Sequence, residues 1–104
     1  MGFEQYHEPA NELSESIRTF ARMITSLTEE AEAIGWYEQR ISLEKDKDAK
    51  AIMQDAQKEE FKHFAMDLEV LFRKKEAWKI IAQGVLFKKG SITKNADAAE
   101  EKAD

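Results

Sequence analysis

Two long stretches of this chain repeat apolar residues at steps of three and four, and this periodicity limits the fold more than any other feature. Side chains spaced in this way lie on one face of an α-helix, so the sequence predicts amphipathic helices over about residues 11–41 and 48–73. The charged segment LEKDKDA separates them, and Asp46 or Asp48 is suited to cap the second helix. A third, shorter helix is expected over KEAWKIIAQGV. No segment shows a clear sequence pattern of a β-strand.

The expected fold is therefore all-α: an antiparallel hairpin of two long helices plus a short C-terminal helix. Two helices cannot enclose a core, because each apolar stripe is covered on one side only. The uncovered stripe predicts association with a second copy of the chain, and two hairpins together make a four-helix bundle. We expect one helical hairpin domain over residues 1–93 and a polar, mobile tail over residues 94–104.

Composition excludes several classes of protein. The net charge is −5, and basic residues are interspersed with acids, so no basic face for nucleic acid is expected. Cysteine is absent, which excludes disulfides, thiolate zinc sites and thiol catalysis. No apolar run approaches the roughly 18 residues that span a bilayer, and no signal peptide is visible, so no membrane partner is expected.

Three polar side chains fall on or beside the predicted packing faces. At about 100° per residue, Glu30 lies on the same side of its helix as Leu27 and Ile34. On the second helix, Glu60 and His63 are three residues apart and share a face at the edge of the apolar stripe. A carboxylate at a packing face costs several kcal/mol unless it is paired or bound to a metal.

A Glu-x-x-His pattern alone occurs by chance in many solvated helices, and Lys58 or Lys62 can pair with these acids at a surface. Its combination with Glu30 is more informative. In di-iron four-helix bundles two helices each supply a Glu and two supply Glu-x-x-His, so this chain holds half of such a site. A two-fold dimer doubles the set to four carboxylates and two imidazoles, and this mixed ligation suits Fe(II), whereas calcium prefers oxygen alone.

Four segments carry a resemblance to a known family: HEP at 7–9, EEAEAIGWYEQR at 29–40, EEFKHFAMDLE at 59–69 and LFKKGSIT near 86–93. Over roughly residues 7–93 the chain resembles the encapsulated ferritins, which are ferritin-like proteins carried inside encapsulin nanocompartments. The resemblance implies a ferroxidase that oxidises Fe(II) with dioxygen at a di-iron centre across a homodimer interface. It also implies a ring of five dimers, iron storage within an encapsulin shell, and a cytoplasmic location.

By the same resemblance, Glu30, Glu60 and His63 fall on the iron ligands, with Glu60 as the bridging carboxylate. Further positions match less directly. Glu29 and Glu32 match acids of a metal-uptake site, which can also take calcium or other divalent ions, or they are simply solvated. Trp36 and Tyr37 match aromatic residues behind the ligands, although packing in a dimer core accounts for them better than a redox role does.

Other interpretations stay open at this point. The final residues, NADAAEEKAD, do not look like the family's shell-docking peptide, so either the chain is truncated or its targeting differs. A helical-hairpin adaptor without metal is the alternative from another class. A di-iron protein of the rubrerythrin or haemerythrin type fits less well, because those bundles lie in one chain and haemerythrins need more than two histidines.

Overall fold

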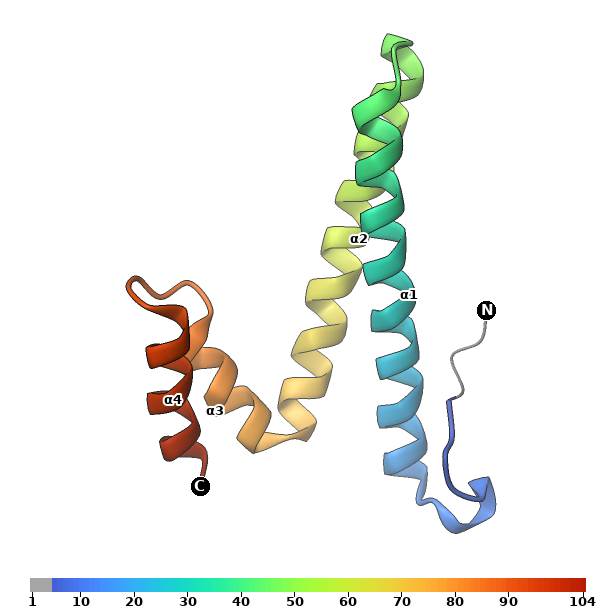
Figure 1. Cartoon of the computed structure of the whole chain (residues 1–104). Helices are drawn as coiled ribbons and strands as arrows, with labels where there is room; N and C mark the ends of the chain where they lie inside the picture. Colours follow the sequence, from blue (N-terminus) through green and yellow to red (C-terminus); the bar gives the residue numbers. More distant parts are fainter. Residues whose placement is uncertain (1–4) are drawn as a thin grey trace. The chain divides into compact units, whose positions relative to one another are not determined.

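The computed structural model describes residues 5–104, so residues 1–4 of the expected hairpin domain lie outside the described residues. These residues are helical and contain no strand, which confirms the all-α prediction (Figure 1). None of the helices over residues 5–104 is long and apolar enough to cross a bilayer. The elements are a 3₁₀ turn, Ala10–Glu12, and four α-helices: α1, Glu15–Leu43; α2, Lys47–Lys74; α3, Glu76–Val85; and α4, Ile92–Ala103.

The chain forms two compact units that divide at residues 69 and 70, within α2. The first contains α1 and most of α2, and the second contains the end of α2 with α3 and α4. The sequence placed a domain boundary later, at residue 93, and the existence of one domain over 1–93 stays a prediction.

The start of the first long helix differs from the predicted one. Pro9 precedes only the short 3₁₀ turn, and α1 begins at Glu15. The hydroxyl of Ser14 accepts a hydrogen bond from the backbone N–H of Ile17 at 3.2 Å, and this satisfies one of the free donors of the first helical turn. The serine cap therefore sets the start of the helix at Glu15, four residues after the start near residue 11 that periodicity alone predicted.

Helices α1 and α2 run antiparallel and side by side in the first unit (Figure 1). Of the two predicted caps, Asp46 is the one that begins α2, because its Oδ1 accepts from the backbone N–H of Ala49 at 2.8 Å. Gln57 joins the two helices. Its buried side-chain amide donates to the carbonyl of Ile34 at 3.2 Å and to Oε1 of Glu38 at 2.9 Å. Both amide hydrogens are used, so Gln57 holds α2 in register with α1 about one turn before Glu60.

The hairpin encloses almost no core of its own. Within residues 5–104 only Gln57, Leu71 and Ala99 are buried, and neither apolar residue belongs to the first unit. Large apolar side chains of that unit stay exposed, namely Ile17, Trp36, Leu43, Ile52, Phe61 and Met66. Ile52 is 70% exposed although it is one of the periodic apolar residues of the second long helix. The exposure agrees with an incomplete bundle, and the four-helix bundle of a dimer stays a prediction.

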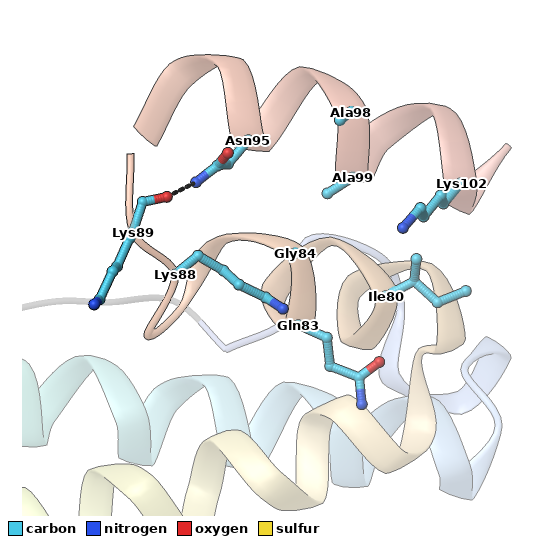
Figure 2. Close-up of a pocket in the computed structure, with 9 residues that line it drawn as sticks. All are labelled: Ile80, Gln83, Gly84, Lys88, Lys89, Asn95, Ala98, Ala99 and Lys102. Atoms are coloured by element: carbon cyan, nitrogen blue, oxygen red, sulfur yellow. Dashed lines mark hydrogen bonds between the residues drawn. The ribbon is translucent and has the colours of Figure 1, made fainter. Parts of the chain in front are cut away.

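In the second unit α3 and α4 pack against each other, where the sequence was expected to end in a polar tail. Ser91 caps α4 by accepting from the backbone N–H of Lys94 at 3.2 Å. Gly84 of α3 faces Ala99 of α4, and the two backbones approach closely because Gly84 has no side chain (Figure 2). The intervening loop turns through Phe87 and Gly90, which have φ angles of 62° and 96°.

We predict that Gly84→Ala destabilises the second unit. The added Cβ collides with the Cβ of Ala99, which is too close to the backbone to swing aside, so overpacking of about 1–3 kcal/mol is expected. Hydrogen exchange should show faster exchange of the α4 amides.

Gly35→Ala is the matched control. Its Cβ meets nothing within 4 Å, so helix propensity alone should stabilise the protein by about 0.5–1 kcal/mol. Unchanged protection of α4 in Gly84→Ala would show that the close contact is not required.

Candidate metal centre

Three ligand-type side chains meet at the face between α1 and α2. Glu30 projects from α1, and Glu60 and His63 project from the same face of α2. One potential ligand atom from each lies within 4.8 Å of the other two, and all three residues are half-buried. Nδ1 of His63 lies 3.5 Å from Oε1 of Glu60. The structure therefore brings together the three residues that the sequence proposed as ligands, and their binding of a metal stays a prediction.

Glu30 is the most perturbed group of the cluster. Its pKa is raised from 4.5 to about 7, chiefly because burial removes water from the charged form, and then because the carboxyl of Asp67 lies within hydrogen-bonding range. The negative charges of Asp67, Glu60 and Glu29 raise the pKa further. Oε1 of Glu30 is a buried oxygen to which no group in residues 5–104 donates a hydrogen bond. A proton, a water molecule or a cation can satisfy such an oxygen.

Asp67 is a member of this neighbourhood that the sequence reasoning missed. It follows His63 by four residues, so it lies on the same face of α2 one turn further along. Its Oδ2 is also buried and receives no hydrogen bond from the described part of the chain. Two ionised carboxylates cannot hydrogen-bond to each other, so the contact with Glu30 is a hydrogen bond only when one of them carries a proton.

The donor set fits a divalent transition metal. Two carboxylates and one imidazole offer the mixed oxygen and nitrogen ligation that Fe(II) accepts, whereas magnesium and calcium prefer oxygen throughout. The buried Oε1 of Glu30 provides a ligand atom that no group in residues 5–104 already occupies. The residues present therefore fit an iron site in chemistry and in position.

The other predicted site residues lie outside this cluster of ligand atoms. Glu29 and Glu32 are exposed on α1, and Glu29 acts on the site through its charge near Glu30. Trp36 is 53% exposed, too open for a residue that packs behind a ligand within one chain. Tyr37 is half-buried, with the guanidinium of Arg40 5.6 Å from its ring centre. The uptake and packing roles assigned to these four residues stay predictions.

A separate cavity of about 450 Å³ lies in the second unit, between α3 and α4 (Figure 2). Its polar lining residues are Gln83, Lys88, Lys89, Asn95 and Lys102, and Asn95 already donates to the carbonyl of Lys89 at 3.0 Å. No carboxylate or histidine lines it, so it offers no ligands to a metal cation.

A helical hairpin that carries one Glu on the first helix and Glu-x-x-His on the second defines a ferritin-like half-bundle. The family profile described as EncFtn-like matches residues 5–89. The chain belongs to this EncFtn-like family, which confirms the resemblance to the encapsulated ferritins. Family membership indicates an iron-related, ferritin-like function.

Individual relatives agree. The chain is 41% identical over 90 residues to a "Ferritin-like protein" of Thermotoga maritima, covering 86% of this chain and 79% of the relative. It is 39% identical over 97 residues to an "Encapsulated ferritin-like protein" of Rhodospirillum rubrum, covering 91% and 69%. The crystal structure of protein ne0167 from Nitrosomonas europaea matches with a TM-score of 0.82 and 40% identity, covering 86% of this chain and 98% of that one. The family match over residues 5–89 spans both long helices.

The raised pKa of Glu30 predicts a pH dependence of stability in the metal-free protein. Between pH 4.5 and about 7 the folded carboxyl retains a proton that the unfolded one releases. The folded state then binds more protons, so the free energy of unfolding should fall as pH rises through this window.

Thermal unfolding of chelator-treated protein across the window checks this expectation. Glu30→Gln should reduce the fall, whereas Glu29→Gln, at an exposed position, should retain most of it. An equal fall in Glu30→Gln and wild type would assign the effect to other groups.

Proposed function

We propose that the protein is a ferroxidase that oxidises Fe(II) to Fe(III) with dioxygen at a di-iron centre formed across a homodimer interface. The observation that carries the proposal is the convergence of Glu30, Glu60 and His63 within 4.8 Å on two facing helices. This is the donor set that one half of a di-iron bundle supplies. Membership of the EncFtn-like family gives independent support.

The dimer follows from the ligand count. One chain offers two carboxylates and one imidazole, whereas a di-iron centre in a four-helix bundle uses four carboxylates and two imidazoles. A second hairpin related by a two-fold axis supplies the other half. The same association would cover apolar side chains that the hairpin leaves exposed, including Ile52 and Phe61.

In this function Fe(II) is the substrate, and the protein supplies ligands, charge and shape. Glu30, Glu60 and His63 would hold the irons: the two carboxylates would offset part of their charge, Glu60 being the one shared between them in this proposal, and His63 would complete each half of the centre. Each Fe(II) would lose one electron, and the two electrons with two protons from solvent would reduce one dioxygen to hydrogen peroxide, so no organic cofactor is needed. The exposed carboxylates of Glu29 and Glu32 collect iron, or calcium and other divalent ions, before the iron reaches the centre. Trp36 and Tyr37 pack behind the ligands once the dimer has formed.

The proposed setting is a cytoplasmic encapsulin nanocompartment, in which the protein assembles as a ring of five dimers and delivers Fe(III) for mineral storage. The printed name of the Rhodospirillum rubrum relative, an encapsulated ferritin-like protein, supports this setting. The overall resemblance of the chain to encapsulated ferritins supports the ring.

Glu60→Ala and His63→Ala should each abolish dioxygen consumption that depends on Fe(II). Even partners of metal ligands cost about 10–100-fold in activity when removed, so loss of a ligand should cost at least that. An oxygen electrode measures the rate, and circular dichroism should show that the helices remain.

Glu59→Ala is the matched control. Its side chain is exposed and, within residues 5–104, pairs with Lys62 at 3.2 Å on the same helix, so activity should be retained. Full activity in Glu60→Ala or His63→Ala would contradict the ferroxidase proposal.

Assembly should depend on iron, because each chain holds half of the ligands. Native mass spectrometry with and without anaerobic Fe(II) should show a shift to a larger, even-numbered oligomer with about one iron per chain. An assembly of constant mass that takes up no metal would favour the alternative of a structural helical adaptor.

A further inference from the structure

Asp67 occupies a position that the di-iron ligand plan does not use. That plan requires a Glu on one helix and Glu-x-x-His on the other, and Glu30, Glu60 and His63 provide them. Asp67 is outside this group of three converging ligand atoms, yet its carboxyl lies against that of Glu30. A fourth acid therefore borders the site through contact with one ligand.

When both carboxyls are ionised, this contact is unfavourable for a hairpin without metal. Oδ2 of Asp67 and Oε1 of Glu30 are both buried, and neither receives a hydrogen bond within residues 5–104. A buried acceptor without a donor costs about 1–3 kcal/mol, and like charges held close together add to this cost. A purely structural contact between α1 and α2 would instead pair a donor with an acceptor, as Gln57 does with Glu38.

We propose that Asp67 is a positioning residue of the metal centre. Its carboxylate repels that of Glu30 and thereby strengthens the binding of a divalent cation. Its negative charge makes the metal-free pair of helices less stable and the metal-bound pair more stable. Both effects act in the same direction on affinity, because binding relieves a repulsion and adds an attraction. Asp67 does this through Glu30 and is not itself one of the three ligands. The inference rests on the proposed function, since it concerns the same site.

This role makes opposite predictions for the two states of the protein. Asp67→Asn keeps the size of the side chain, removes its charge and places an amide donor beside the carboxyl of Glu30. The metal-free variant should therefore melt at a higher temperature than wild type. Its affinity for a divalent ion should fall by about 10–100-fold, as for other residues that act through a metal ligand.

Co(II) is a suitable probe, because it takes similar ligands and its visible spectrum reports the ligand field. Co(II) titrations of wild type and Asp67→Asn, at a mildly alkaline pH, give the affinity and the spectrum. Melting curves with and without Co(II) give the effect on each state. Asp55→Asn is the matched control, because Asp55 is an exposed acid on the same helix and should change neither quantity. Asp67→Glu retains the charge and should keep most of the affinity.

The proposal is supported if Asp67→Asn binds Co(II) at least tenfold more weakly, with an altered spectrum, while its metal-free form is stabilised. Unchanged affinity in a folded Asp67→Asn variant overturns it, and the contact with Glu30 is then a hydrogen bond of structural value only. Equal weakening in Asp55→Asn also overturns it, because general charge would then explain the effect. Wild-type protein that binds no Co(II) contradicts the proposed function as well, which separates the two failures.

Discussion

The candidate site depends on acidic side chains that meet between two helices. Glu30 of α1 lies against Asp67 of α2 and close to Glu60, and burial raises the pKa of Glu30 to about 7. Within residues 5–104 two buried carboxylate oxygens receive no hydrogen bond, so folding of the hairpin alone does not stabilise this arrangement. In the proposed metal centre a divalent cation would supply the positive charge that these carboxylates lack.

The first unit lacks a partner for its apolar surface as well as for its acidic side chains. A hairpin that leaves Ile52 and Phe61 exposed is incomplete as a folded body, just as two carboxylates and one imidazole are incomplete as a di-iron site. In the proposed dimer a second copy would complete both at once, so that metal binding and burial of apolar surface would reinforce each other.

Sequence reasoning succeeded where the signal is local. The periodicity predicted α1, α2 and α3 to within a few residues, and Asp46 was named as a possible cap. Sequence reasoning failed where a residue's packing partner lies far away in the chain. Helix α4 was missed because its only buried residue is Ala99, whose packing depends on Gly84 fifteen residues earlier. Asp67 was missed because its role depends on a contact with Glu30, which lies on another helix.

The sequence by itself determined the helical class, the family and the placing of Glu30, Glu60 and His63 on packing faces, because helical periodicity and short motifs are written in neighbouring residues. Only the tertiary structure decided that these three side chains meet within 4.8 Å, that Asp67 contacts one of them, Glu30, and that Gln57 links the two helices. The physical reason is that helix rotation and register arise from packing between segments, and a single buried amide or an unsatisfied oxygen is enough to distinguish one register from the next.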